Sequence, residues 1–155
     1  TQRALTPERL HPLMTDFLVP TYTNLLTALS AWLGKAGKLH ADPGALMSAR
    51  LAPDMFPLST QIRFACMQAY EGVARLSGEA FPPVWHDLLE EGRNGAAAPG
   101  TLAEAQSRIR DTLSYLEGLA PGALKGAGGR AVAHDLPTGM VFDMTGDQYA
   151  RAWAL

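Results

Sequence analysis

The strongest constraint on the fold of this chain is residues 50–58, with the sequence RLAPDMFPL. Its two prolines, Pro53 and Pro57, each fix their own φ and disfavour helical geometry for the residue before them. Helical patterns lie on both sides, so this segment must form a rigid, non-repetitive elbow between helices. An elbow of this kind serves equally well as a structural corner or as one wall of a ligand site, and the sequence leaves both readings open.

Before the elbow, apolar residues recur every three or four positions over residues 15–39, which predicts a long amphipathic helix. Pro20 falls within its first two turns and either starts the regular part of this helix or kinks it. A short helix is predicted over residues 44–49. Asp42 is its expected N-cap, and Pro43 occupies the first position, where proline is favoured.

After the elbow, a second long helix is predicted to open at Pro57 and to end at Gly78, a typical C-terminal residue. Residues 81–85 are expected to be extended because of their two prolines, and residues 86–100 to be a helical turn running into a flexible surface insertion. A third long helix should begin after Thr101, whose hydroxyl can form a capping box with Glu104.

The C-terminal part alternates between apolar and polar residues. Residues 130–136 and 140–144 predict two short strands, joined by a turn at residues 137–139. Because an isolated hairpin is only marginally stable, these strands must lie on the helices. Thr145 and Gln148 form a second predicted capping box, which starts a last helix running to Leu155. That helix is short and ends on apolar residues, so we expect further chain or a partner to cover it.

Length and charge narrow the functional classes. The 155 residues fit one domain, with residues 1–13 as a polar arm or extension and residues 14–155 as the helical domain. A net charge of −2 provides no basic field for nucleic acid or for an anionic membrane surface. The single cysteine, Cys66, and the lack of a signal or spanning segment predict a cytoplasmic location.

Three features together resemble a bacterial and fungal family of unknown function in the DinB-like superfamily. They are the elbow followed by Gln61, the Val19-Pro20 pair in the first helix, and Thr145-Gly146 before the last helix. The elbow is the specific signal, and the resemblance covers residues 15–155. It implies a mostly α, DinB-like up-and-down four-helix bundle with a short β-hairpin before the last helix, often assembled as a homodimer.

Many relatives in that superfamily bind a divalent metal through three histidines, one on the second long helix and two on the fourth. This chain departs from the pattern, because neither helix carries a histidine as far as the sequence runs. No phosphate loop, nucleophile elbow or dinucleotide fingerprint is present either. We therefore predict no metal site and no cofactor. The histidines fall in an arm, a loop, an insertion and a strand: His11, His40, His86 and His134.

Arg50 and Asp54 are the strongest candidates for chemistry. In a structural role, Asp54 would accept hydrogen bonds from amides at the start of the next helix, and Arg50 would tie the elbow to a neighbour. In a catalytic role, Asp54 would be a desolvated general acid or base, and Arg50 would hold an anionic substrate. Structural roles of this kind are the more common. The expected ligand contacts are Gln61, Met55, Phe56, Tyr22 and Trp153.

Three functions are compatible with these residues. The first is binding of a small, largely apolar molecule between helices near the elbow. In its catalytic version, the protein is a cofactor-independent lyase or isomerase that uses Asp54 as acid or base. The second is a non-catalytic, dimeric interaction protein with an exposed apolar helix face. The third is the metal-dependent transferase typical of the superfamily. All three rest on analogy of fold.

Overall fold

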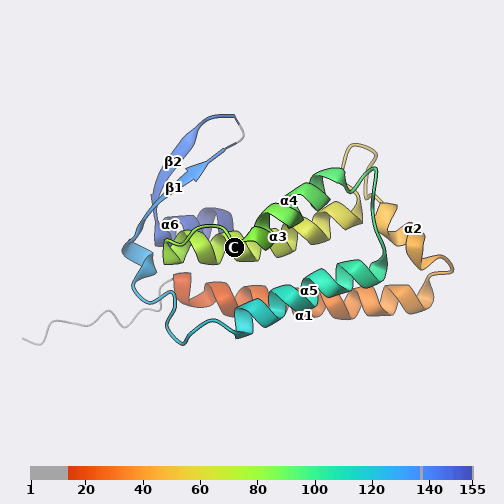
Figure 1. Ribbon diagram of the computed structural model, residues 1–155, viewed down its shortest axis with the longest axis horizontal. Helices are drawn as coiled ribbons and strands as arrows, with labels where there is room; N and C mark the ends of the chain where they lie inside the picture. Colours follow the sequence, from red (N-terminus) through yellow and green to blue (C-terminus); the bar gives the residue numbers. More distant parts are fainter. Residues whose placement is uncertain (1–13, 137, 155) are drawn as a thin grey trace, which may run out of the picture.

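The structure is a computed structural model, described here for residues 14–136 and 138–154. Within that part, helices precede and follow a single hairpin (Figure 1). A 3-10 turn over Ala127–Gly129 leads into the hairpin, and a π-helical turn over Ala150–Ala154 continues the last helix. The elements in chain order are α1 (Met14–Leu39), α2 (Pro43–Ser48), α3 (Leu58–Ser77), α4 (Pro83–Asn94), α5 (Leu102–Glu117), β1 (Ala131–Asp135), β2 (Val141–Thr145) and α6 (Gly146–Tyr149).

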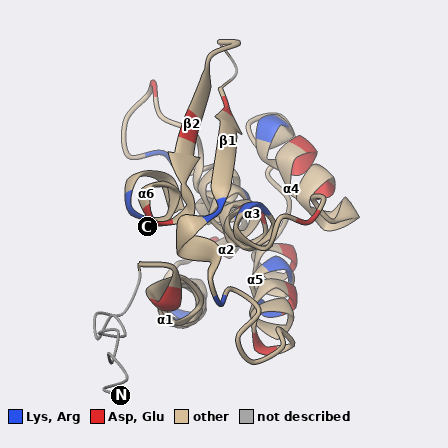
Figure 2. Cartoon of the chain, turned by 90° about the vertical axis from the view of Figure 1, so that its left-hand side faces the viewer, with Lys and Arg blue, Asp and Glu red and all other residues tan. Residues whose placement is uncertain are grey.

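The long helices pack side by side along one direction, with α1 and α5 antiparallel to each other (Figure 1). Viewed from the end, α1, α3, α5 and α6 surround the core, α4 lies outside α3, and the hairpin projects away from the helices (Figure 2). The mostly α fold, with a hairpin directly before the last helix, is confirmed. None of the described helices is long and apolar enough to cross a membrane.

The predicted helix ends are largely correct because their capping residues act locally. Asp42 accepts hydrogen bonds from the backbone nitrogens of Gly44 at 3.0 Å and Ala45 at 3.3 Å, which starts α2. Both predicted capping boxes form, at Thr101 before α5 and at Thr145 before α6. Gly78 ends α3 with a φ of 77°, in the left-handed region that favours glycine.

Residues 81–94 differ from the prediction. Residues 81–85 were expected to be extended and residues 86–100 to form a helical turn that runs into a flexible insertion, but α4 starts at Pro83 and continues for 12 residues. The first N–H groups of a helix have no partner within it, so a proline at the first position costs no hydrogen bond. Pro83 therefore starts the helix where the sequence pattern indicated a break. The helix packs closely on α3 at Gly92, where a Cβ atom would lie 2.3 Å from Cε1 of Phe64.

The core lies between α1, α3 and α5 and is closed at one end by the hairpin and α6. Burial raises the pKa of the Cys66 thiol to about 11, as expected for a buried thiol without a catalytic partner. The strands pair in antiparallel register, with Val132 opposite Met144, and alternate residues of β1 are buried. The largest fully buried side chains include Tyr149, Leu18, Met47, Ile62, Leu76, Leu88 and Ile109.

Candidate functional site

The elbow closes on itself through its own backbone. The Leu58 nitrogen donates to the Ala49 carbonyl at 2.8 Å, and the Met55 nitrogen donates to the Ala52 carbonyl at 3.0 Å. The Arg50 guanidinium donates to the Met55 carbonyl oxygen. Arg50 was expected, in its structural role, to tie the elbow to a neighbouring element, but its hydrogen-bond acceptor is a carbonyl within the elbow itself.

A groove of about 380 Å³ lies against the elbow, and its lining is mainly apolar. Its wall contains apolar side chains that remain in contact with solvent: Leu51 is 93% exposed, Phe56 58% and Met55 40%. Arg50 and Gln61 add the polar groups of the lining. The structure thus brings together four of the residues expected from the sequence, namely Arg50, Met55, Phe56 and Gln61.

Asp54 lies at the edge of this site. It is exposed and is not among the residues that line the groove. The expected capping of the next helix by Asp54 is wrong, because Pro57 is the N-cap of α3 and no side chain caps that position. Pro57 is buried and fixes the entry angle of the helix by its own restricted φ of −66°.

Tyr22 and Trp153 do not line the elbow groove. Tyr22 is buried on α1, and its hydroxyl lies 3.0 Å from the position that a Cβ atom on Gly72 would occupy. Trp153 lies near β1, where its ring centroid is 4.4 Å from that of His134. These two aromatic residues belong instead to a group of side chains around Glu71, which we call the Glu71 centre. Its other members are Arg75, Trp85, His134 and Tyr149.

The Glu71 centre is a buried polar cluster with the Glu71 carboxylate in its middle. Arg75 Nε donates to one carboxylate oxygen at 2.8 Å, and Trp85 Nε1 donates to the other at 3.2 Å. The Arg75 guanidinium also donates to the Ala133 carbonyl of β1 at 2.7 Å. Burial and the neighbouring Arg75 charge lower the pKa of His134, which favours the neutral imidazole. This centre joins α3, α4 and the hairpin.

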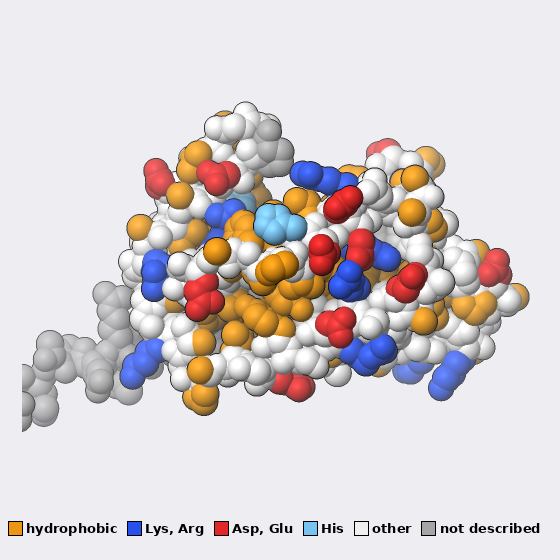
Figure 3. Space-filling view, viewed as in Figure 1, with side chains coloured by type: hydrophobic (Ala, Val, Ile, Leu, Met, Phe, Trp, Pro, Cys, Tyr) orange, Lys and Arg blue, Asp and Glu red, His pale blue; other side chains and the backbone are white. Residues whose placement is uncertain are grey.

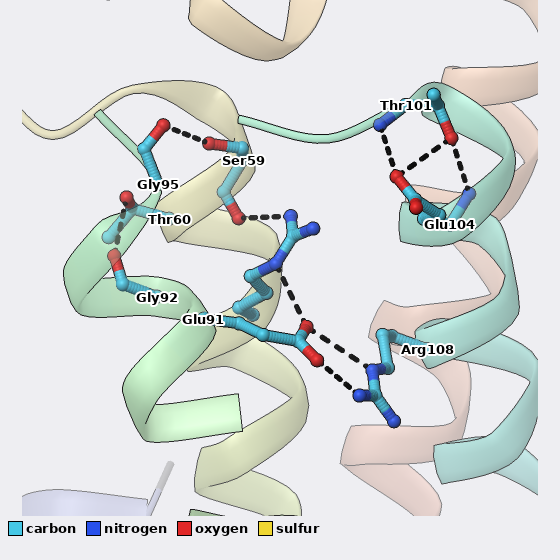
Figure 4. Close-up of polar contacts among 9 residues, drawn as sticks. Ser59, Thr60, Glu91, Gly92, Gly95, Thr101, Glu104 and Arg108 are labelled. Atoms are coloured by element: carbon cyan, nitrogen blue, oxygen red, sulfur yellow. Dashed lines mark hydrogen bonds and ion pairs between the residues drawn. The ribbon is translucent and has the colours of Figure 1, made fainter. Parts of the chain in front are cut away.

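A second polar cluster connects α3, α4 and α5 (Figure 4). Glu91 on α4 accepts from Arg63 Nε at 3.1 Å and is also paired with Arg108 on α5. The Arg63 side chain is only 5% exposed, and its guanidinium donates to the Ser59 carbonyl at 3.2 Å. Clefts of about 490 Å³ and 330 Å³ adjoin this network, and charged side chains of both signs gather on this face (Figure 3).

These three sites differ in the chemistry that they can support. In the Arg63–Glu91–Arg108 network one carboxylate is shared by two guanidinium groups from two other helices, so its geometry supports a structural tie between helices. The elbow groove combines uncovered apolar surface with a cation and an amide, which is the usual composition of a small-molecule site. Within residues 14–136 and 138–154, no three His, Cys, Asp or Glu side chains are grouped in a way that could hold a metal ion.

Sequence reasoning missed the two buried polar groups for a physical reason. Their members come from three or more separate elements, so no local spacing marks them. The one local signal was the i,i+4 spacing of Glu71 and Arg75 on the predicted second long helix, which is typical of an intrahelical ion pair. The elbow residues were found because they lie within one short segment.

Comparison with known proteins identifies a family and similar solved structures. Residues 14–155 match the family model described as Domain of unknown function (DUF1993). A crystal structure of a DinB family member protein from Shewanella denitrificans is 28% identical, with a TM-score of 0.63. The alignment covers 91% of this chain and 75% of that chain. No curated protein matches the sequence.

Proposed function

Since this chain belongs to the DUF1993 family of domains of unknown function and has a DinB-like fold, we propose that it binds a small, largely apolar molecule in the elbow groove. The predicted family and fold class are confirmed by the comparisons. The observation that carries the proposal is the apolar wall of Leu51, Met55 and Phe56, held open to solvent by a rigid backbone.

Exposure of these side chains has an energetic consequence. Burying a Leu, Met or Phe side chain contributes roughly 1.5–3 kcal/mol relative to leaving it in water. An apolar ligand that covers all three would gain several such contributions, less the loss of its own freedom of motion. The groove is formed by the elbow before any ligand arrives, because Arg50 and the backbone hydrogen bonds already fix its shape.

Arg50 and Gln61 give the site its expected polarity. A guanidinium at the edge of an apolar groove favours a ligand with one anionic or strongly accepting group. The Gln61 amide can donate to or accept from the same molecule. An apolar body with one carboxylate or carbonyl end is therefore the class of ligand that we propose.

A cofactor-independent lyase or isomerase is the catalytic form of this proposal. It assigns the role of general acid or base to Asp54, which lies next to Met55 in the chain but outside the groove lining. In that form, Asp54→Asn should leave binding unchanged and abolish turnover of a substrate. Binding alone requires no contribution from this carboxylate.

An environment-sensitive dye tests the binding proposal directly. We expect 8-anilinonaphthalene-1-sulfonate, an apolar molecule with one anionic group, to bind with a stoichiometry of one, measured by fluorescence titration. Leu51→Ser should weaken this binding by about tenfold, because the dye loses most of one leucine contact. Since Leu51 is almost fully exposed, the change should leave the melting temperature unaltered.

The matched control is Leu39→Ser. Leu39 is 86% exposed, at the end of α1, and is not one of the groove residues. Equal affinities of the Leu51 and Leu39 variants would show that the dye binds elsewhere and would count against the proposed site.

A second function, a homodimeric interaction protein, is favoured by a different observation. Helix α1 carries an exposed apolar stripe, which we define as Phe17, Leu25 and Trp32. Their spacings of eight and seven residues place them on one side of the helix, next to the buried side formed by Leu18 and Leu26. An uncovered stripe of this length is typical of a helix that packs against a partner.

Sedimentation equilibrium should then give a particle of twice the 16.6 kDa chain mass. Trp32→Glu should convert it to a monomer, because a buried charge in an apolar interface is not tolerated. Leu39→Glu, outside the stripe, should leave the mass unchanged. A wild-type monomer at all concentrations would remove this second function.

A further inference from the structure

Several buried polar atoms of the Glu71 centre have no hydrogen-bond partner within the described part of the chain. They are the hydroxyl oxygens of Tyr22 and Tyr149 and the Nδ1 atom of His134. Tyr149 is fully buried, and Tyr22 and His134 are more than nine-tenths buried. Native proteins almost always provide partners for such groups.

These groups surround the same carboxylate. Burial raises the pKa of the Tyr22 hydroxyl, and the neighbouring Tyr149 and Glu71 raise it further. Burial and Glu71 act in the same direction on the pKa of Tyr149. His134 Nδ1 lies 3.7 Å from a Glu71 oxygen, which is too long for a direct hydrogen bond. A distance of this kind indicates that water should be considered as a bridge.

One protein group could serve as a partner. Gln68 lies beside both tyrosine hydroxyls, and its Nε2 atom donates to the Trp153 carbonyl at 3.2 Å. Its Oε1 atom is left to accept from a phenol hydroxyl, but it offers nothing to Nδ1 of His134 when that atom is an acceptor. Arg75 and Trp85 donate to Glu71 and have no acceptor capacity to offer the hydroxyls. A buried water needs two to four polar partners, and this centre supplies that number.

We propose that the Glu71 centre binds one internal water molecule between Glu71, Tyr22 and Tyr149. The water donates one hydrogen to the Glu71 carboxylate and accepts from at least one phenol hydroxyl, while His134 lies within reach of the same position. It thereby joins α1, α3 and α6 at the end of the bundle that the hairpin covers. This site is separate from the elbow groove and does not depend on what the groove binds.

Whether the melting temperature rises or falls when these tyrosines are replaced by phenylalanine tests this site. If the hydroxyls had no partner, replacing either tyrosine by phenylalanine would remove an unpaired buried polar group and raise the melting temperature. With water bound, Tyr149→Phe and Tyr22→Phe should each lower the melting temperature by about 2–4 °C. The double variant should lose less than the sum of the two, because both hydroxyls serve one molecule.

Tyr115→Phe is the matched control, since Tyr115 is half-buried on α5 and its hydroxyl is not among the buried unpaired atoms. A crystal structure of the wild-type chain should show one ordered oxygen within hydrogen-bond distance of a tyrosine hydroxyl and Glu71. The proposal would be overturned by an unchanged or raised melting temperature of both single variants. It would equally be overturned by density in which the Gln68 amide bridges the two hydroxyls and no water is present.

Discussion

Gly146→Ala should strongly destabilise the fold. A Cβ atom at this position would lie 2.0 Å from the carbonyl oxygen of Ala127 and 2.9 Å from its carbon. Both contacts are with backbone, which cannot rotate away as a side chain can. The Gly146 nitrogen also donates to the Arg130 carbonyl at 2.8 Å, so moving the helix start would lose this hydrogen bond.

We expect the free energy of unfolding to fall by at least about 3 kcal/mol, at the upper end of the usual cost of overpacking. Urea denaturation followed by circular dichroism would measure it. Gly129→Ala, in the Ala127–Gly129 turn on which Gly146 packs, is the matched control, because nothing lies within 4 Å of its Cβ position and its φ is not positive. Equal stabilities of the two variants would show that α6 does not pack on the Ala127 turn as described.

Glu91→Gln should produce the second large effect. This change leaves the Arg63 guanidinium, which is almost fully buried, without its carboxylate partner. Removing one partner of a fully buried pair costs about 3–5 kcal/mol. Because the Glu91 side chain is 33% exposed, solvent screens part of that loss, and we expect about 1–3 kcal/mol by urea denaturation.

The same pair predicts a dependence of stability on pH. Burial alone would raise the pKa of Glu91, but hydrogen bonding and charge from Arg108 and Arg63 outweigh it and hold the pKa below its ordinary value. A lowered pKa in the folded state stabilises the fold above the unfolded pKa, near 4.5, and this contribution is lost as pH falls through the folded value.

Wild type should therefore lose more stability than Glu91→Gln when the pH is lowered from 6 to about 3. The control is Glu90→Gln, an exposed neighbour on the same helix, whose profile should follow that of wild type. Parallel profiles for wild type and Glu91→Gln would mean that the carboxylate contributes no pH-dependent stability through this network.

The sequence predicted those parts of the fold that depend on local chemistry. Asp42, Thr101 and Thr145 cap helices by contacts within three residues, so their positions can be recognised without tertiary information. Helix α4 was predicted only as a helical turn after residue 85, because its start depends on how two adjacent prolines are used. Pro82 is the extended N-cap and Pro83 the first helical residue, which only packing against α3 reveals.

The candidate site could likewise be predicted only where it depends on residues close together in the sequence. The elbow could be identified because Arg50, Met55 and Phe56 lie within seven residues and Gln61 lies one turn into the next helix. The placement of Tyr22 and Trp153 at the Glu71 centre could not be predicted, since it depends on how α1 and α6 meet. Exposure of Asp54 likewise follows from the path of the elbow rather than from its neighbours in sequence.

The packing of α6 between α1 and α3 also has a consequence for the order of folding. Contacts between α1 and α6 join segments that are far apart in the chain, so they require the largest loop closure in the domain. Helices α3 and α4 are adjacent and can associate early. During synthesis, the surface of α1 and α3 that Tyr149 covers therefore remains exposed to solvent until the hairpin and α6 have emerged from the ribosome.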